Sequence, residues 1–231
     1  MEFDFPLFEG ALLRRYKRFL ADVRLTNGKM VTAHCPNSGS MKGLSLPGSS
    51  VLLWESANPR RKLRYTWELV KADGVWVGIN TNRPTRLVTE SLGRGEITEL
   101  AQWPHWRREV TVGESRLDLL LETGQRRCWV ELKNVTLVEK GVAMFPDAIT
   151  ARGQKHLREL VKLAEKGDCA AALFVVQRED VHSLSPADDI DPEFGRQLRR
   201  AREKGVAILA YKWRVSPEGI FFAGPVPVKM K

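Results

Sequence analysis

The sequence predicts a small β-barrel over residues 1–83 followed by an α/β domain over residues 84–231. Two observations predict this division. Before Pro84, short apolar stretches are separated by turn dipeptides and helical periodicity is almost absent, as is typical of a small barrel. After Pro84, stretches with a strand pattern alternate with stretches of helical periodicity, as is typical of parallel strands joined by helices.

Turn dipeptides locate the strands of the predicted barrel. Asn-Gly and Asp-Gly tolerate the positive φ angles of a two-residue hairpin turn. Two hairpins are therefore predicted, residues 23–26 with 29–33 around Asn27-Gly28 and residues 65–71 with 75–80 around Asp73-Gly74. A further apolar strand at 51–54 follows Pro47-Gly48, and residues 36–40 have the composition of a loop.

The elements of the second part follow in order. A short helix is expected at 86–92, followed by a link containing Trp and Pro at 103–106. A longer helix with apolar residues every three or four positions begins at 149–151 and ends at Gly167. The continuous apolar run 170–176 is typical of a strand buried on both faces. Asp191-Pro192 begins the last helix, which ends at Gly205 before a strand at 206–211.

The positive charge is concentrated in the barrel. Lys and Arg outnumber Asp and Glu by 37 to 28, which gives a net charge of +9. Residues 1–84 hold 13 basic and 7 acidic side chains and so carry six of these nine charges. Such a surplus favours a polyanion, and nucleic acid first, as the partner. On composition alone, an ordinary basic protein whose charge maintains solubility remains an alternative.

Other features of the composition restrict the class of protein. The three cysteines, Cys35, Cys128 and Cys169, are far apart and odd in number, which does not fit a disulfide framework. The first ten residues lack the basic segment of a signal peptide, and no apolar run approaches ~20 residues. We therefore expect a cytoplasmic protein without membrane contact.

Two neighbouring strands carry the candidate chemistry. Residues 115–121 and 128–133 read as strands joined by a turn, and side chains two apart on a strand share a face, so Glu131 and Lys133 point the same way. If the strands pair antiparallel with Leu121 opposite Arg126, Asp118 falls diagonal to Glu131 on that face, ~7–8 Å away at the backbone. A slip of one residue would place the two acids on opposite faces.

Two carboxylates that approach each other repel, and a hard divalent cation relieves that repulsion. Mg²⁺, or Mn²⁺ in its place, needs only one or two protein carboxylates because water and phosphate oxygens complete its shell. Lys133 would orient the attacking water or offset charge that grows on the phosphate. The pattern therefore indicates phosphodiester hydrolysis, although alternating charges also occur on many solvated strand faces.

Polar residues gather at the start of the longer helix. Arg152, Gln154, Lys155 and His156 follow the segment 145–148, and a helix N-terminus offers free N–H groups to a phosphate. We therefore expect these side chains to contact nucleic acid, together with Arg116, which precedes Asp118 on its strand. The alternative is structural, with Asp147 capping the helix and Lys155 solvated.

Two basic clusters in the barrel are interleaved with aromatic residues. Barrels of this type follow a strand with cations and stack its bases on aromatic rings. The predicted nucleic-acid contacts are Arg14, Arg15, Lys17 and Arg18 in one cluster and Arg60, Arg61, Lys62 and Arg64 in the other. The rings are Tyr16, Phe19, Tyr65 and Trp67, and alternation along a strand would bury about half of them whatever the function.

Several long motifs occur together in one order and spacing, and in them the chain resembles the sugar fermentation stimulation protein A family. The matching stretches are residues 15–23, 34–39, 115–118, 131–137, 145–148 and 152–160. The resemblance covers both parts of the chain. Leu132 and Asn134 differ from the Val and Ser common in this motif, and Leu119 replaces a common Phe, but no candidate ligand is lost.

The resemblance implies an OB-fold-like N-terminal barrel and a PD-(D/E)XK nuclease-like α/β domain with a mixed central sheet. It also implies DNA binding and a link to sugar-utilisation genes. Carried over by position, Asp118, Glu131 and Lys133 match the nuclease motif, and Glu90 on the short helix matches an additional acidic residue that many such enzymes use for the metal.

These observations leave open which function the chain performs. The first hypothesis is a DNA-binding, Mg²⁺-dependent nuclease, with Asp118, Glu131 and Glu90 as metal ligands and Lys133 as a catalytic residue. The second is a non-cleaving DNA-binding regulator of sugar (maltose-type) metabolism genes. A sugar-metabolising enzyme is a third reading, disfavoured because the sequence has no nucleotide fingerprint, P-loop or loop carboxylate pair. A homodimer is possible under each of them.

Overall fold

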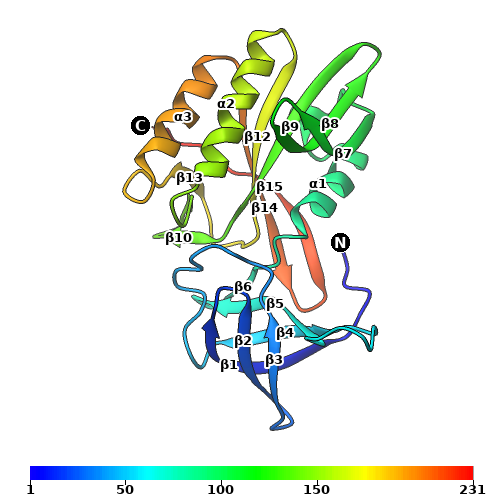
Figure 1. Cartoon of the computed structure of the whole chain (residues 1–231), viewed down its shortest axis with the longest axis vertical. Helices are drawn as coiled ribbons and strands as arrows, with labels where there is room; N and C mark the ends of the chain where they lie inside the picture. Colours follow the sequence, from blue (N-terminus) through cyan, green and yellow to red (C-terminus); the bar gives the residue numbers. More distant parts are fainter. Residues whose placement is uncertain (231) are drawn as a thin grey trace.

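The computed structural model describes residues 1–230 and has two domains that lie end to end (Figure 1). The N-terminal domain is a six-stranded sheet in the order β3-β2-β1-β4-β5-β6. A parallel pairing of β3 with β5 closes the sheet into an OB-like barrel. Its strands are β1 (Leu7–Tyr16), β2 (Leu20–Leu25), β3 (Met30–His34), β4 (Ser50–Glu55), β5 (Tyr65–Ala72) and β6 (Val75–Gly78).

Both predicted hairpins of the barrel are present. The pairs β2–β3 and β5–β6 are antiparallel, and Gly28 and Gly74 adopt φ angles of 83° and 84° in their turns. Strand β1 was not predicted, because its C-terminal half is rich in arginine and the sequence analysis read it only as a basic cluster. Its alternation is visible in the structure, where Leu12 is fully buried and packs with Val23 and Trp67 in the barrel core.

The second domain has a mixed six-stranded sheet in the order β15-β14-β12-β9-β8-β7. Strand β12 is parallel to both β9 and β14, whereas the remaining neighbours are antiparallel. Its strands are β7 (His105–Val112), β8 (Ser115–Thr123), β9 (Arg126–Val135), β12 (Cys169–Val176), β14 (Ala207–Ser216) and β15 (Gly219–Pro225). A small sheet, β10-β11-β13, comprises β10 (Leu137–Glu139), β11 (Val142–Phe145) and β13 (Ser183–Pro186). The predicted fold class is confirmed.

Helices cover both faces of the large sheet (Figure 1). On one face, α1 (Pro84–Gly93) packs through Leu87 and Val88. On the other face, α2 (Ala151–Glu165) and α3 (Pro192–Glu203) pack side by side. A short 3₁₀ turn, η1 (Thr98–Leu100), follows α1. The N-caps are Thr150 and Asp191, each accepting a backbone N–H three residues further on, so the predicted start of α3 is confirmed.

Edge strands account for most of the missed elements. Strand β7 begins within the segment 103–106 that the sequence analysis placed as a link. It was missed because three successive exposed, charged residues, at positions 107–109, hide the alternation. Exposed, charged edge strands are common because they discourage pairing with other chains. Strand β15, at the opposite edge, was also not predicted.

The two domains share a packed interface. Leu52 and Leu69 of the barrel belong to the apolar cluster on the α1 face of the sheet. Arg178, only 2% exposed, donates to the Thr136 carbonyl and to Asp73 of the β5–β6 turn. The first residues lie on the α/β domain, where the Met1 amino group donates to the Ile220 carbonyl. These contacts fix the barrel relative to the sheet.

None of the helices within residues 1–230 is long and apolar enough to cross a membrane.

Candidate functional site

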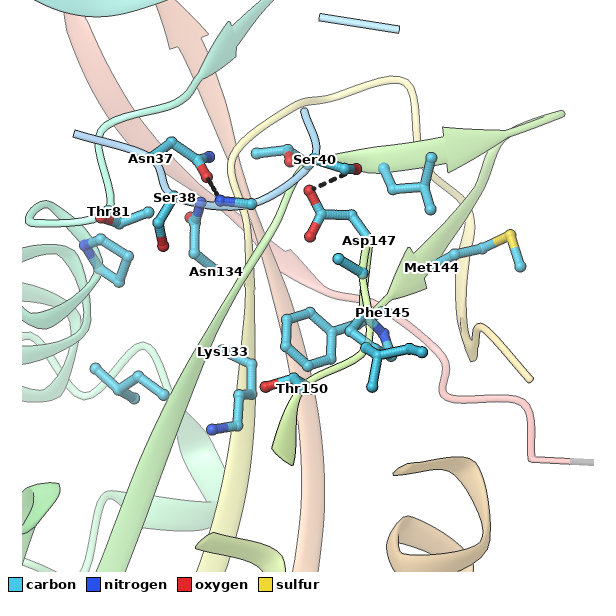
Figure 2. Close-up of a pocket in the computed structure, with 18 of the residues that line it drawn as sticks. Asn37, Ser38, Ser40, Thr81, Lys133, Asn134, Met144, Phe145, Asp147 and Thr150 are labelled. Atoms are coloured by element: carbon cyan, nitrogen blue, oxygen red, sulfur yellow. Dashed lines mark hydrogen bonds between the residues drawn. The ribbon is translucent and has the colours of Figure 1, made fainter. Parts of the chain in front are cut away.

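A cavity of about 640 Å³ lies between the two domains. One wall comes from the barrel, and the opposite wall comes from β9 and the segment that leads into α2. Figure 2 shows Asn37, Ser38 and Ser40 on the first wall facing Lys133, Asn134 and Thr150 on the second. Asp118 and Lys133, both predicted from sequence, line this cavity.

Strand β9 places Glu131 and Lys133 on the face that α2 covers. The strand lies inside the sheet, between β12 and β8, so both side chains are nearly buried, at 4% and 7% exposure. Lys133 Nζ donates to Glu131 Oε1 at 2.7 Å. His156 Nδ1, from the second turn of α2, contacts the same oxygen. Burial of these charges is tolerated because they pair with one another.

Strand β8 places Asp118 beside this group. The observed register sets Leu121 opposite Cys128 and Leu119 opposite Val130, which brings Asp118 level with Glu131. The register assumed in the sequence analysis, Leu121 opposite Arg126, is therefore wrong by two residues. An even shift keeps every side chain on its face, so the two acids still meet. Asp118 Oδ2 accepts the backbone N–H of Leu132 at 2.7 Å.

The two carboxylates have opposite pKa shifts. Burial and then repulsion by Glu131 raise the pKa of Asp118 to about 6, despite the N–H of Leu132 and the nearby Lys133. Burial also acts to raise the pKa of Glu131, but Lys133 and His156 outweigh it and hold that pKa below its usual range. Glu131 is thus the ionised member of the pair, and Asp118 holds its proton more readily.

The donor set fits a divalent cation. Glu131 Oε2 is buried and has no hydrogen-bond partner, although buried carboxylate oxygens are nearly always paired. Asp118, held nearby, is a second hard oxygen donor. Residues 1–230 contain no group of three or more His, Cys, Asp or Glu arranged around a common point. Two carboxylates suffice for Mg²⁺, which keeps several waters.

Glu90 lies elsewhere. Its carboxylate contacts three cationic groups, the Met1 amino group at 3.2 Å, Arg86 at 2.8 Å and Arg94 at 3.7 Å. Burial acts to raise the pKa of Glu90, but Arg86 and the amino terminus hold it below its usual range. Glu90 is not among the residues that line the cavity. The structure therefore does not bring it together with Asp118 and Glu131.

The polar residues at the start of α2 have several roles. Gln154 donates to both oxygens of Asp191 and so joins α2 to the cap of α3. Lys155 donates to the Glu114 carbonyl in the β7–β8 turn, and Arg152 is exposed. His156 faces Glu131 rather than solvent. Of this group, only His156 contacts the carboxylate pair.

The first basic cluster of the barrel adjoins the cavity. Arg15 is committed to the barrel loop, since it donates to the carbonyls of Asn37, Gly39 and Ser40. Arg14 pairs with Asp22 at 2.8 Å. Lys17 and Arg18 occupy the exposed β1–β2 turn with positive φ, and Arg18 lines the cavity.

The second basic cluster lies in the β4–β5 loop. Arg61 packs over the Trp54 ring and donates to Thr66 at 2.8 Å, and Arg64 pairs with Glu55 at 2.9 Å. Arg60 and Lys62 are exposed. Arg116 is exposed on β8, with Glu109 at 3.6 Å. Contact of these cations with nucleic acid stays a prediction.

The aromatic residues between the clusters divide as the alternation rule predicts. Trp67 and Tyr65 are buried in the barrel, whereas Phe19 is 47% exposed. The Phe19 ring stacks on the His34 ring with 6.4 Å between centroids.

Sequence reasoning missed how the cavity is bounded. Residues 36–42, which we call the bridging loop, connect the barrel to both sides of the cavity. Thr81 Oγ1 donates to the Pro36 carbonyl at 2.5 Å. On the other side, Ser40 Oγ and the Met41 N–H donate to Asp147 at 3.2 and 3.0 Å. Asp147 therefore joins the domains and does not cap α2, for which the capping residue is Thr150.

A small polar pair was also missed. Gln177, fully buried directly after β12, donates to Asn134 at 2.5 Å, and Asn134, which follows Lys133 on β9, lines the cavity. No local sequence signal marks such a pair, because the two residues are 43 positions apart and meet only through the parallel pairing of β9 with β12.

Comparisons with known proteins match both domains. The model of the SfsA N-terminal OB domain matches residues 13–79, and that of the sugar fermentation stimulation protein RE domain matches residues 82–219. Sugar fermentation stimulation protein homologues from Geobacter metallireducens and Geotalea uraniireducens are 57% and 56% identical. These alignments cover 99% and 100% of both chains.

A solved structure is similar over the whole chain. Pyrococcus furiosus SfsA, determined in complex with Ca²⁺, superposes with a TM-score of 0.92 and is 31% identical, with 99% of this chain and 98% of that chain covered. The barrel, the sheet and their arrangement are therefore shared. The chain belongs to the sugar fermentation stimulation protein family.

Proposed function

We propose that this protein is a DNA-binding, divalent-metal-dependent phosphodiesterase whose site is formed by Asp118, Glu131 and Lys133. One observation carries the proposal. Two carboxylates from separate strands meet beside a cavity that Asp118 and Lys133 line; Glu131 has an unpartnered buried oxygen, and the pKa of Asp118 is raised to about 6. Two acids held together in a folded site repel each other, and a bound cation would relieve that repulsion.

The residues of the site have different roles in the proposed reaction. Asp118 and Glu131 would hold Mg²⁺ or Mn²⁺, and the bound ion would polarise the phosphate and acidify a water. Lys133, fixed by Glu131 at 2.7 Å, presents its ammonium beside the carboxylates and stabilises negative charge on the phosphate. His156 holds the Glu131 carboxylate from α2 and is a positioning residue.

Two further observations support a nucleic acid as the substrate, and a third supports a hard cation at the site. The barrel carries most of the net positive charge, and Arg18 of its first basic cluster lines the same cavity as Lys133. The chain belongs to a family with an OB domain, a fold that binds oligonucleotides. A relative of the same fold binds Ca²⁺, a hard cation that prefers oxygen ligands.

The test is cleavage of labelled single-stranded, duplex and branched DNA in the presence of Mg²⁺ or Mn²⁺. We expect cleavage to require the metal and to fall ~10²–10³-fold in Lys133→Met, which removes the ammonium but keeps the length of the side chain. Lys162→Met is the matched control, because Lys162 is exposed on α2 and pairs only with Glu159. Equal cleavage by both variants would refute the assignment of Lys133.

The second candidate is a regulator that holds DNA without cutting it. The exposed cations of the barrel support it, because they contact phosphates without any need for the acidic pair. A binding titration at several salt concentrations discriminates the two candidates. Steep salt dependence on every substrate that the wild-type protein leaves uncut would favour the regulator.

A further inference from the structure

The bridging loop forms one side of the cavity at the candidate site. It is attached to Thr81 on one side and to Asp147 on the other, and both of these residues line the cavity. Lys42 extends the second attachment through an ion pair with Glu139 at 2.9 Å. The barrel side of the cavity that holds Asp118 and Lys133 is therefore a loop held at both ends.

The size of the cavity limits what enters it. A sphere of about 640 Å³ is roughly 11 Å across, which is narrower than the ~12 Å major groove of B-DNA alone. An intact duplex does not fit inside a cavity of this size. An unpaired nucleotide is small enough to enter, as it does in other enzymes that act on nucleotides removed from the stack.

One exposed apolar side chain lines the cavity, and a second directly follows a residue that lines it. Ile149, 78% exposed, lines the cavity immediately before α2. Phe19, 47% exposed, directly follows Arg18 of the cavity lining, and its carbonyl accepts the N–H of Cys35 beside the bridging loop. Aromatic rings beside cations are how proteins hold unpaired bases without sequence preference.

We propose that the cavity takes single-stranded polynucleotide, with bases stacking on Phe19 and packing on Ile149 while Arg18 contacts the backbone. This proposal deepens the proposed function and relies on it only for what happens to the strand once it is bound. Single-stranded DNA and single-stranded RNA both present an unpaired sugar-phosphate chain, and the test below compares the two with one sequence.

The test is binding of fluorescent oligonucleotides in EDTA, so that no cleavage interferes, at one fixed salt concentration. The probes are a single-stranded DNA, an RNA of the same sequence and the blunt DNA duplex. We expect at least one single strand to bind more than tenfold tighter than the duplex. Phe19→Ala is expected to weaken that binding ~5–100-fold, the range for loss of one stacked base.

The chain supplies matched controls for the two apolar contacts. Met30 and Leu46 are 59% and 62% exposed on the same barrel, but unlike Ile149 they do not line the cavity, and unlike Phe19 they do not adjoin a residue that lines it. Met30→Ala and Leu46→Ala should bind as the wild type does, whereas Ile149→Ala should bind more weakly. Equal losses in all four variants, or tighter binding of the duplex, would overturn the inference.

Failure of this inference is distinguishable from failure of the proposed function. Cleavage is measured on the same oligonucleotides in Mn²⁺. Preferential binding of single strands without any cleavage supports the inference and removes the phosphodiesterase. Cleavage inside an uninterrupted duplex overturns the inference and leaves the phosphodiesterase standing.

A pair of thiols carries a second, independent inference. Cys128 on β9 and Cys169 on β12 are direct neighbours across the parallel pairing, with their Sγ atoms 3.0 Å apart. Adjacent strands are ~4.8 Å apart, which falls within the ~4.4–6.8 Å range between Cα atoms joined by a disulfide. Both cysteines are free in the structure. A bond between them would need little movement of the backbone.

The environments of the two thiols differ. Cys169 is partly exposed, lies near Arg126 and accepts a hydrogen bond from Cys128, which lowers its pKa to about 7. Cys128 is fully buried, and the same hydrogen bond together with burial raises its pKa. Cys169 is therefore the nucleophile of the pair and Cys128 the partner that reacts second.

We infer that Cys169 is a peroxide-reactive thiol that Cys128 resolves to a disulfide. The Cys169 sulfur attacks a peroxide oxygen, the O–O bond breaks, and a sulfenic acid and water form. Cys128 sulfur then attacks that sulfenic sulfur, the S–O bond breaks, and a second water leaves with the thiol proton. Two thiols lose two electrons in total, and one hydrogen peroxide becomes two waters.

The test is mild treatment with hydrogen peroxide, then alkylation of the unfolded protein and peptide mass mapping. We expect Cys128 and Cys169 to become protected together, with dithiothreitol restoring both, while Cys35 stays alkylatable. Cys35, also fully buried, is the internal control. Cys128→Ser should leave a Cys169 sulfenic acid that dimedone traps. Oxidation of Cys35 at the same rate as Cys169, or no disulfide in the wild type, would overturn the inference.

Discussion

Two buried glutamates, one in each domain, differ in how completely their carboxylate oxygens are paired. Glu68 on β5 is fully buried, and its oxygens accept from Asn80 at 2.7 Å and from two nitrogens of Arg83. Glu131 on β9 is 4% exposed, but Lys133 and His156 share one of its oxygens while the other has no partner. The first carboxylate is fully satisfied and the second is not.

The neighbourhoods of the two glutamates differ in the same sense. Glu68 faces an amide and a guanidinium, which complete its hydrogen bonds within the barrel. Glu131 faces Asp118, whose pKa is raised to about 6 by burial and then by repulsion from Glu131. A group that serves only stability is expected to find partners for every atom, because a buried unpaired oxygen is costly. Glu131 keeps that cost, which is why we assign it to the proposed site.

The largest expected effect is on stability in Glu68→Gln. The change leaves the Arg83 guanidinium without its buried counter-ion, and loss of one partner of a buried pair costs about 3–5 kcal/mol. Unfolding by urea at pH 7.5 measures the difference. A loss below about 1 kcal/mol would mean that Arg83 finds another partner, and the contrast between the two glutamates would then fail.

The second prediction concerns the pH dependence of Asp118→Asn. Because the folded pKa, about 6, lies above the ordinary value of 3.8, the folded state binds the proton more tightly. Wild-type stability should therefore fall as the pH rises from 4 to 7, by about 1–3 kcal/mol, since the carboxyl is partly exposed. Below pH 4 the carboxyl is protonated in both the folded and the unfolded state, so its ionisation no longer destabilises the fold. The asparagine variant should lack the decline.

Urea unfolding in EDTA across pH 4.5–8 measures this difference, and Mg²⁺ or Mn²⁺ provides the control. A cation that binds the ionised pair should stabilise the wild type more at pH 8 than at pH 5 and should not stabilise the variant. A stability difference that is flat with pH would show that burial and Glu131 together do not raise the pKa of Asp118.

Much of this contrast could be predicted from the sequence, because its determinants are local. Turn dipeptides gave the hairpins of the barrel, and the two-residue period placed Glu131 and Lys133 on one face. The family motif named Asp118 as well. Even the wrong register preserved the meeting of the two acids, since only an odd shift would have separated them.

The remainder depends on packing between distant segments. His156 was counted as a nucleic-acid contact because a helix start reads as an anion site, yet α2 turns it toward Glu131. Glu90 was expected at the metal because of the motif, but the amino terminus folds back onto it. The bridging loop and the thiol pair arise from the docking of domains and from parallel pairing, which no local pattern encodes.

The third prediction is that Glu131→Gln changes stability far less than Glu68→Gln does, by about 1 kcal/mol or less. The variant loses the charge that pairs with Lys133 but also removes the repulsion on Asp118, and the two effects oppose each other. The pKa of Asp118 should fall below 6, which moves its pH-dependent step to lower pH. A loss as large as that of Glu68→Gln would show that both glutamates are structural.

The smallest expected effect concerns a third, exposed carboxylate, Glu139, which extends the comparison to the surface. Its ion pair with Lys42 joins the bridging loop to β10, but both side chains are more than half exposed. Water screens such a pair, so a double-mutant cycle of Lys42→Ala and Glu139→Ala should give a coupling of about 0.2–1 kcal/mol. The coupling should disappear in 1 M NaCl, where charges are screened within ~3 Å. A coupling that persists in high salt would mean that the attachment of the loop is stronger than its exposure indicates, and that the bridging loop stays closed through contacts beyond this ion pair.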